Sequence, residues 1–362
     1  MPKNKCVRVG YGTVSQIHET KMLECNVETV AIVEVDEQKR FQAQQEGFTV
    51  FSSCQEAAKL NPTFWDICVS TNQHLSVIQS ILDSAPQANI FIEKPICLFS
   101  EIPALRRTLL NFEGKITVNE NYASSTIKNM VQTIAFNELQ IHPEKIVVEF
   151  TKNRELDFAR GRFIDRELGS LGYEGSHMVT LVSEMLEDYV PYRILENKFS
   201  DLIFKGSDQL LENQGSAYVR YKSLSQVEIE LYTSLAGTIK YKHPLFCIED
   251  IPHDDLNSKY RFIAVYGTNY HNDKYCVVGF FEPINSFKRC QGAVYVTLNN
   301  KVERIVAPLR DDTMLLHFQQ TLKYFQGVAE NPYSVEKSIK IVEILNSFTD
   351  EMRFSKSLHS LV

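Results

Sequence analysis

Short apolar runs alternate with helix-like segments over the first third of the chain. Runs such as CVRVGYG, ETVAIVEVD, FWDICVST and NIFIEKP are rich in β-branched residues, and segments with helical spacing such as HLSVIQSILDSA separate them. This repetition of strand and helix predicts a parallel, doubly wound sheet. Because ligands of such sheets bind at the carboxyl ends of the strands, residues at those ends are the first candidates for a functional site.

The pattern changes near residue 122. Longer strand candidates with partial alternation follow, among them EKIVVEFTKN, QVEIELYTSL, YRFIAVYGT and KYCVVGFFEP. They predict a second, α+β domain with an open-faced, mostly antiparallel sheet. Near the end, DTMLLHFQQTLKYFQGVAE and SVEKSIKIVEILNSFTDEMRFS predict two amphipathic helices, and segment 240–259 is interpreted as a long loop.

Composition narrows the class of protein. The 362 residues are 44% hydrophobic and 23% charged, which is typical of a soluble globular protein with two domains. A net charge of −7, with no run of more than two basic residues, argues against nucleic acid and membrane partners. We find neither an apolar stretch long enough for a membrane helix nor a signal-peptide pattern, and we expect a cytoplasmic protein.

The eight cysteines are far apart and form neither a C-x-x-C pair nor a Cys/His ligand pattern. We interpret them as free thiols that serve mostly in packing, and we expect no metal site.

The segment VRVGYGTVSQIH carries a nucleotide signal. Gly10 and Gly12 follow the first strand, where glycines permit a tight turn and a close approach of backbone to a pyrophosphate. Ser15 stands in place of the third glycine, which weakens the match. Asp36 ends the next predicted strand 24 residues after Gly12, near the spacing of the carboxylate that binds the adenosine ribose. An ordinary turn with a solvated aspartate is the alternative.

A carboxylate also bears on the choice of cofactor. Glu37 follows Asp36, so a 2′-phosphate on the ribose would meet two acidic residues and no arginine. The sequence therefore predicts NAD(H) in preference to NADP(H).

The segment NIFIEKPICLF places Lys94 at the carboxyl end of a predicted central strand. Pro95 disfavours helical backbone for Lys94 and keeps the segment extended toward the ligand crevice. A surface lysine at a strand end is the alternative interpretation.

Five segments together resemble one protein family. VRVGYGTVSQIH, VSTNQH, IFIEKP, GSLGYEGSHMVTLV and FQQTLKYFQG, in this order, resemble motifs of the Gfo/Idh/MocA oxidoreductases, the family of glucose-fructose oxidoreductase and inositol dehydrogenase. The resemblance covers nearly the whole chain. It implies an NAD-binding Rossmann domain over residues 1–122 and a substrate-binding and oligomerisation domain over residues 123–362.

The resemblance also implies the chemistry. Family members transfer a hydride between nicotinamide and a secondary hydroxyl or keto group, often of a sugar, amino sugar or cyclitol. Lys94 and His177 then share polarisation of the oxygen and proton transfer, since a histidine can carry a proton near neutral pH. The cofactor contacts that it implies are Gly10, Gly12, Thr13, Val14, Asp36, Ser70, Thr71, Asn72, His74, Glu93 and Lys94.

Candidate substrate contacts follow from the positions of strand ends and from the resemblance. They are Asn121, Tyr122, Lys152, Arg154 and His177, with Glu120 and Asn153 beside them.

The chain departs from the family motif near His177. Tyr173 stands where the family usually has an aspartate, Glu174 follows it, and Thr180 replaces the later aspartate. Tyr173 joins the proton relay, or Glu174 substitutes from the next position, or the chemistry needs a weaker base. His18 and His74 are expected to shape the cofactor pocket.

Two further functions stay open: an imine or enone reductase on the same scaffold, and a non-catalytic nucleotide-binding regulatory protein. Many aromatic residues lie on the second sheet. If they point outward, they form an exposed apolar patch, and we expect a homodimer or homotetramer through that sheet. The positions are Tyr218, Tyr221, Tyr232, Phe262, Tyr266, Phe280, Phe281 and Tyr295.

Overall fold

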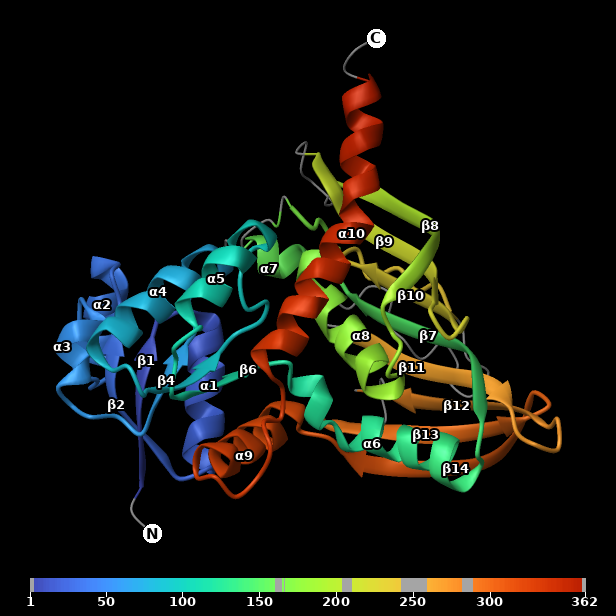
Figure 1. The fold of residues 1–362 in the computed structure, drawn as a ribbon, viewed down its shortest axis with the longest axis horizontal. Coiled ribbons are helices and arrows are strands. Elements are labelled where there is room, and N and C mark those ends of the chain that lie inside the picture. Colours follow the sequence, from blue (N-terminus) through green and yellow to red (C-terminus); the bar gives the residue numbers. More distant parts are fainter. Residues whose placement is uncertain are drawn as a thin grey trace. The chain divides into compact units, whose positions relative to one another are not determined.

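The structure is a computed structural model, in which the chain divides into two compact units. The residues that it describes are 3–159, 165, 167–203, 210–241, 259–281 and 289–359, with side chains described up to 349. The first unit comprises residues 1–121 and 314–343, and the second comprises 122–313 and 344–362 (Figure 1). The boundary that the sequence suggested therefore misses a segment near the end of the chain.

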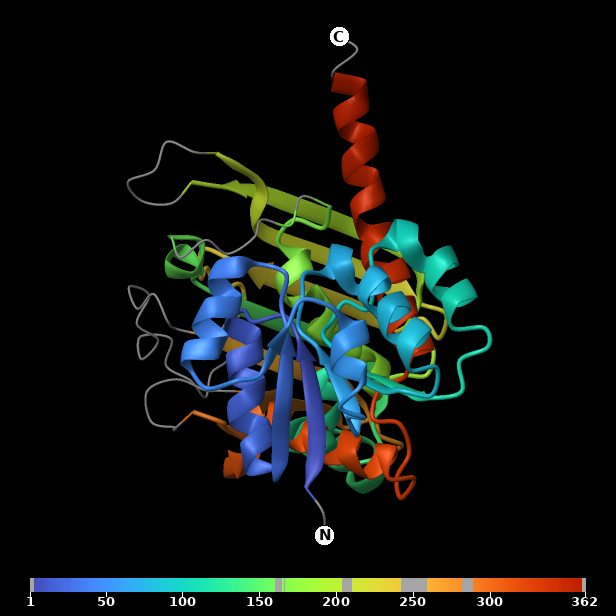
Figure 2. The ribbon, with the colours of Figure 1, turned by 90° about the vertical axis from the view of Figure 1, so that its left-hand side faces the viewer.

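The first unit contains a six-stranded parallel sheet in the order β3-β2-β1-β4-β5-β6. Helices lie on both faces of its strands (Figure 2). The strands are β1 (Asn4–Val9), β2 (Val27–Val33), β3 (Val50–Phe51), β4 (Phe64–Ile67), β5 (Asn89–Ile92) and β6 (Lys115–Val118). The helices before residue 122 are α1 (Thr13–Glu24), α2 (Glu37–Gln45), α3 (Cys54–Ala58), α4 (Thr71–Ser84) and α5 (Ile102–Thr108), with a 3-10 turn η1 (Phe99–Glu101). The prediction of a doubly wound parallel sheet is confirmed.

The late helices complete this unit. In α9 (Thr313–Phe325), His317 Nε2 donates to the carbonyl of Val118 at 2.9 Å. Between the helices, Asn331 Nδ2 donates to the carbonyl of Ile116 at 2.8 Å, so the segment covers the edge of β6. The first part of α10 (Val335–His359) packs Ile339 against the core of the parallel sheet. The apolar faces of these helices were visible in the sequence, but the surface that they cover was not.

The second unit contains an eight-stranded sheet in the order β14-β13-β12-β11-β7-β10-β9-β8. β10 pairs with β7 in parallel, and the other neighbouring pairs are antiparallel. The predicted mostly antiparallel sheet is therefore confirmed. The strands are β7 (His142–Lys152), β8 (Pro191–Leu202), β9 (Leu211–Ser223), β10 (Glu228–Ser234), β11 (Lys259–Thr268), β12 (Lys274–Phe280), β13 (Gln291–Leu298) and β14 (Lys301–Arg310).

Helical segments of the second unit pack on this sheet. α6 contacts β12 and β13, and α8 contacts β7 and β10. The segments are η2 (Asn121–Ser124), which begins at the last residue of the first unit, α6 (Thr126–Gln132), the π-helical η3 (Thr133–Glu138), α7 (Glu155–Ala159) and α8 (Leu171–Met185).

The aromatic side chains of the second sheet are buried within the chain. Tyr221, Phe262, Phe280, Phe281 and Tyr295 are each at most 2% exposed, Tyr232 is 7% exposed, and Tyr218 and Tyr266 are half-buried. The expected exposed apolar patch is therefore wrong. One reason is local cover: backbone N–H groups of Lys240 and Tyr241 donate to Glu149 at 2.9 and 2.8 Å, and Tyr241 packs against Phe262. Most of the predicted loop, residues 242–258, lies outside the described residues.

The seven described cysteines are free thiols, as expected, and Cys247 lies outside the described residues. Among the helices that the structure describes, none is both long and apolar enough to cross a membrane.

Candidate functional site

A glycine loop joins β1 to α1. Gly10 has φ +97°, and a Cβ there would meet the carbonyl of Cys68 at 3.0 Å, so the turn requires glycine. Gly12 precedes the twelve-residue helix α1 without a side-chain cap, and a Cβ there would meet nothing within 4 Å. Ser15 is buried and donates through Oγ to the carbonyl of Gly12 at 3.0 Å. Ser15 therefore fits the third glycine position, and the helix N-terminus stays open to an anion.

A carboxylate that was not predicted from the sequence, Glu34, bonds the backbone of this loop. β2 ends at Val33, and the Glu34 carboxylate accepts hydrogen bonds from the backbone N–H of Tyr11 at 2.8 Å and of Val35 and Asp36 at 2.8 and 3.0 Å. Glu34 is 8% exposed. A spacing of 22 residues from Gly12 would have suggested it, but the apparent strand ran on to Asp36.

Asp36 is the N-terminal cap of α2. Its carboxylate accepts the backbone N–H of Lys39 at 3.0 Å, and this hydrogen bond lowers the pKa of Asp36. Aspartate is a favoured residue at this position because it satisfies a free donor of the helix. Asp36 therefore caps a helix at the rim of the site, while Glu34 lies under the glycine loop.

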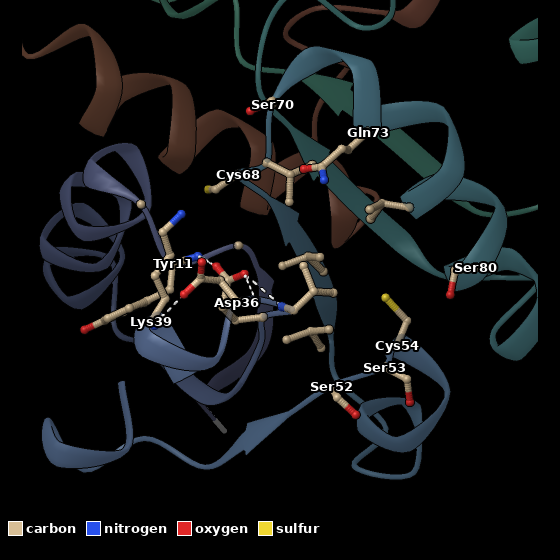
Figure 3. A pocket seen from close by; sticks show the side chains of 18 of the residues that line it. Tyr11, Asp36, Lys39, Ser52, Ser53, Cys54, Cys68, Ser70, Gln73 and Ser80 are labelled. Carbon is tan, nitrogen blue, oxygen red and sulfur yellow. Dashed lines mark hydrogen bonds between the residues drawn. The ribbon is translucent and has the colours of Figure 1, made fainter. Parts of the chain in front are cut away.

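A cavity of about 630 Å³ opens at the carboxyl ends of β1, β2 and β4. Gly10, Gly12, Glu34, Asp36 and Ser70 line it, and Figure 3 shows Tyr11 and Asp36 on one side and Ser70 and Gln73 on another. Of the expected cofactor contacts, Thr13, Val14, Thr71, Asn72, His74, Glu93 and Lys94 do not line this cavity.

Two cations also lie at the start of α2. Lys39 lines the cavity, and Arg40 donates to the carbonyl of Val35 at 2.7 Å. The prediction of NAD(H) from Asp36 and Glu37 did not include these two positive charges.

His74 of α4 is completely buried. Its Nδ1 lies 3.0 Å from the carbonyl of Pro95 and its Nε2 lies 3.1 Å from the carbonyl of Val69. Burial lowers the pKa of His74. His74 therefore ties α4 to the segment that follows Lys94.

Lys94 lies two residues beyond the end of β5, as expected, and is half-buried. The preceding Glu93 points inward: its Oε1 lies 2.9 Å from Nε2 of His18 and accepts from Nδ2 of Asn119. The glycine helix and the strand end that bears Lys94 are thus joined by side chains.

His18, Asp66 and Cys68 bring three ligand-type atoms within 4.8 Å of one another. Asp66 Oδ2 accepts from Nε of Arg8 at 2.7 Å, and Asp66 Oδ1 lies 2.9 Å from Nδ1 of His18. Burial would raise the pKa of Asp66, but His18 and Arg8 hold it at about 2. Because a guanidinium occupies the same carboxylate, we interpret the cluster as a network of ion pairs.

In the second unit, α8 presents a charged residue to a cluster around Tyr122. Glu174 is 1% exposed and accepts from Arg154 and, at 2.8 and 3.0 Å, from Arg261. Arg261 also donates to the Tyr122 hydroxyl at 2.8 Å, and the Tyr122 ring lies 5.0 Å from the ring of His177. The residues brought together are therefore Glu174, His177, Tyr122 and two arginines.

Tyr173 has different surroundings. It is 2% exposed and belongs to an apolar cluster with Leu202, Leu211 and Leu235. Its hydroxyl accepts the backbone N–H of Asp165 at 3.2 Å. The structure thus gives Tyr173 a packing position.

The remaining substrate candidates divide between the units. Lys152 Nζ and Arg154 share Asp157 at 3.0 and 2.7 Å, and burial together with Arg154 lowers the pKa of Lys152. Asn153 Oδ1 accepts the backbone N–H of Glu155 and has a local role. Asn121 belongs to the first unit, whereas Tyr122 and Arg154 belong to the second.

Comparison with known proteins identifies the first domain. Residues 4–109 match the model of an oxidoreductase family with an NAD-binding Rossmann fold, GFO_IDH_MocA. Residues 4–109 are a Gfo/Idh/MocA domain. The resemblance to these oxidoreductases is therefore confirmed, and so is the expected NAD-binding fold. No curated protein matches the chain.

Solved structures share the fold over almost the whole chain. A putative NADPH-dependent oxidoreductase from Desulfitobacterium hafniense is 12% identical with a TM-score of 0.72, and 95% of this chain and 94% of that one are covered. An oxidoreductase from Agrobacterium radiobacter, solved with NAD+, L-tartaric acid and magnesium, is 14% identical, with a TM-score of 0.70 and the same coverage. A UDP-N-acetylglucosamine 3-dehydrogenase from Acidithiobacillus ferrooxidans is 12% identical with a TM-score of 0.67, and 96% and 97% are covered. At these identities the likeness shows that the Gfo/Idh/MocA domain is followed by a second domain of the same fold as theirs.

Proposed function

We propose that the protein is an NAD(H)-dependent oxidoreductase that transfers a hydride between nicotinamide and a secondary hydroxyl or keto group of a polar small molecule. The observation that carries the proposal is the cavity over the glycine loop, with Glu34 beneath it, in a domain of an oxidoreductase family. The open N-terminus of α1 and the lack of a Cβ at Gly12 fit a pyrophosphate, and the Glu34 and Asp36 carboxylates fit ribose hydroxyl groups.

The bound cofactor supplies the hydride, so the protein has to orient the substrate and move one proton. Lys94, at the end of β5, is the group that polarises the substrate oxygen or donates to it. His177 is the proton carrier, and the adjacent Tyr122, Arg261 and Glu174 fix its surroundings. We assign the role of the family aspartate to Glu174, because it bonds both Arg154 and Arg261 in this cluster.

We further infer a preference for NADH over NADPH. A ribose 2′-phosphate would approach the carboxylates of Glu34 and Asp36, which repel it. Lys39 and Arg40 oppose this preference, but Arg40 already bonds the carbonyl of Val35 and lies 3.6 Å from Glu37. We therefore expect a moderate preference.

The substrate class rests on the architecture and on a similar dehydrogenase of a nucleotide sugar. Sugars, amino sugars and cyclitols are the proposed substrates. An imine or enone reductase is a second candidate, which the packed position of Tyr173 favours because these substrates need one polarised acceptor and no strong base.

The test is a panel of sugars, amino sugars and cyclitols assayed for NAD+ reduction, and of the matching ketones and imines for NADH oxidation. Lys94→Ala and His177→Ala should each lower turnover about 100-fold or more, the usual scale for positioned acid and base groups. Lys59→Ala and His142→Ala, at exposed positions, are the matched controls. Turnover unchanged in Lys94→Ala and His177→Ala would contradict the proposed roles.

We also propose a homodimer or homotetramer through the second sheet. Its aromatic residues are buried, and of the two edge strands, β8 and β14, we propose β14 as the interface because Val302 and Ile305 are 40% and 58% exposed there. A small-molecule substrate remains the proposed partner of the second unit.

A further inference from the structure

A chain of ion pairs runs beneath the carboxyl ends of the parallel strands in the first unit. Arg8 of β1 bonds Asp66 of β4 at 2.7 Å, Asp66 lies 2.9 Å from His18 of α1, and His18 lies 2.9 Å from Glu93, which follows β5. Arg8, Asp66 and His18 are completely buried, and the side chain of Glu93 is 15% exposed. This series of ion pairs ends at Glu93, the residue that precedes Lys94.

Both ring nitrogens of His18 face carboxylate oxygens. A neutral imidazole has one N–H, so it can donate to Asp66 or to Glu93 but not to both. The pKa values of Asp66 and Glu93 are both lowered, so both groups are ionised and can only accept. Two good hydrogen bonds at 2.9 Å therefore require the imidazolium, which a carboxylate on each side stabilises.

The groups around His18 support this protonation state. Burial alone would lower the pKa of His18, but the neighbouring Cys68 and Asp66, which both lie within hydrogen-bond distance of Nδ1, raise it well above its ordinary value. Burial also raises the pKa of the Cys68 thiol to about 12 and that of Cys6 well above its ordinary value, so both thiols stay neutral. Other residues that contact the network are Glu19, Met22, Thr29, Asn119, Phe91 and Phe318.

The network carries one excess negative charge when His18 is protonated and two when His18 is neutral. Arg8 and the imidazolium give two positive charges, and Glu19, Asp66 and Glu93 give three negative charges. A neutral side chain at position 18 would leave Glu93 with Asn119 as its polar neighbour inside the domain. The carboxylate would then be drawn toward the next positive charge in the sequence, Lys94.

We propose that His18 is a positioning residue that anchors the Glu93 carboxylate inside the sheet and thereby fixes where the Lys94 side chain begins. The backbone adds to this anchor, because the Glu93 N–H donates to the carbonyl of Ile67 at 3.0 Å. Only the catalytic consequence rests on the proposed function, whereas the anchor itself is a property of the first unit.

The first test is the protonation of the His18 ring in the intact protein, measured by ¹⁵N NMR. Both nitrogens of His18 should carry protons at pH 7 and stay protonated as the pH rises above the ordinary histidine range. His74, equally buried but facing backbone carbonyls, should be neutral in the same spectra. A His18 ring with one proton at pH 7 would overturn the inference, and this holds even if variants fail to fold.

The second test compares His18→Gln with His317→Gln. His317 is also completely buried beside Phe91, but it bonds a backbone carbonyl. His18→Gln should lower kcat about 100-fold, because a displacement of about 1 Å at a reacting group has that effect, with little change in NADH affinity. Glu93→Gln should then lower kcat by a smaller factor in the His18→Gln variant than in the wild type, because both substitutions break the same His18–Glu93 interaction. Equal effects of His18→Gln and His317→Gln on kcat would refute the positioning role.

A third readout needs no substrate, so failure of the proposed function and failure of this inference are distinguishable. In ¹³C NMR of the protein with dimethylated lysines, the Lys94 signal, assigned by its loss in Lys94→Arg, should move in His18→Gln and stay in place in His317→Gln. A Lys94 signal that does not move in His18→Gln would overturn the inference.

Discussion

The position of Glu34 makes a sharp prediction about cofactor binding. Its carboxylate accepts three backbone N–H bonds, one of them from Tyr11 in the glycine loop. In Glu34→Gln an NH2 group has to face at least one of these donors, so at least one charge-assisted hydrogen bond is lost. Such bonds contribute about 1.5–3 kcal/mol each. At about 1.4 kcal/mol per tenfold, we expect NADH affinity to fall about 10- to 100-fold.

Asp36→Asn is the matched variant. Asparagine caps a helix about as well as aspartate does, so the hydrogen bond to Lys39 N–H survives and NADH affinity should change less than about threefold. The assay is a fluorescence titration with NADH, and thermal unfolding of each variant provides the control for folding. If Asp36→Asn weakens NADH binding as much as Glu34→Gln does, the assignment of Glu34 as the principal carboxylate is refuted.

Three other predictions follow from the described contacts. Tyr173→Phe should keep most of the wild-type turnover, whereas Glu174→Gln should lower turnover about 100-fold. A large loss in Tyr173→Phe with little loss in Glu174→Gln would instead assign proton transfer to Tyr173. Asp66 has a pKa of about 2, below its value in the unfolded chain, so its stabilisation of about 2 kcal/mol is present above pH 4 and lost as the pH falls toward 2. In urea unfolding, the free energy of unfolding of Asp66→Asn should fall less steeply between pH 4 and pH 2 than that of the wild type. An equal slope in both proteins would show that Asp66 does not contribute to acid unfolding. Ile305→Lys should reduce the oligomer measured by light scattering, whereas an unchanged mass would exclude β14 as its interface.

The local features of the first unit were readable from the sequence because each depends on neighbouring residues. Gly10 has the positive φ that its place in the turn requires, and Lys94 follows the strand end that its apolar run marked. Glu34 was missed for a physical reason. The alternation of VEVD continues the strand pattern to Asp36, but β2 ends at Val33 because Asp36 caps the start of α2.

Features that depend on distant packing were not readable. His18 looked like a pocket residue because nothing near it in the sequence indicates Asp66 or Glu93, which lie 48 and 75 positions away. The helix that contains Ile339 had an apolar face without a known partner, and the structure places it on the parallel sheet. The sequence did not show whether Tyr295 points outward, and it lies in an apolar cluster that Tyr241 helps to cover.

The most direct test of the account is a paired fluorescence titration of the protein with NADH and NADPH at equal ionic strength. We predict saturable binding of NADH and an affinity for NADPH that is lower by about tenfold or more, the effect of about 1.4 kcal/mol of repulsion at Glu34 and Asp36. Equal or tighter binding of NADPH would contradict the role of these carboxylates. Binding of neither nucleotide would contradict the proposal of an NAD(H)-dependent enzyme.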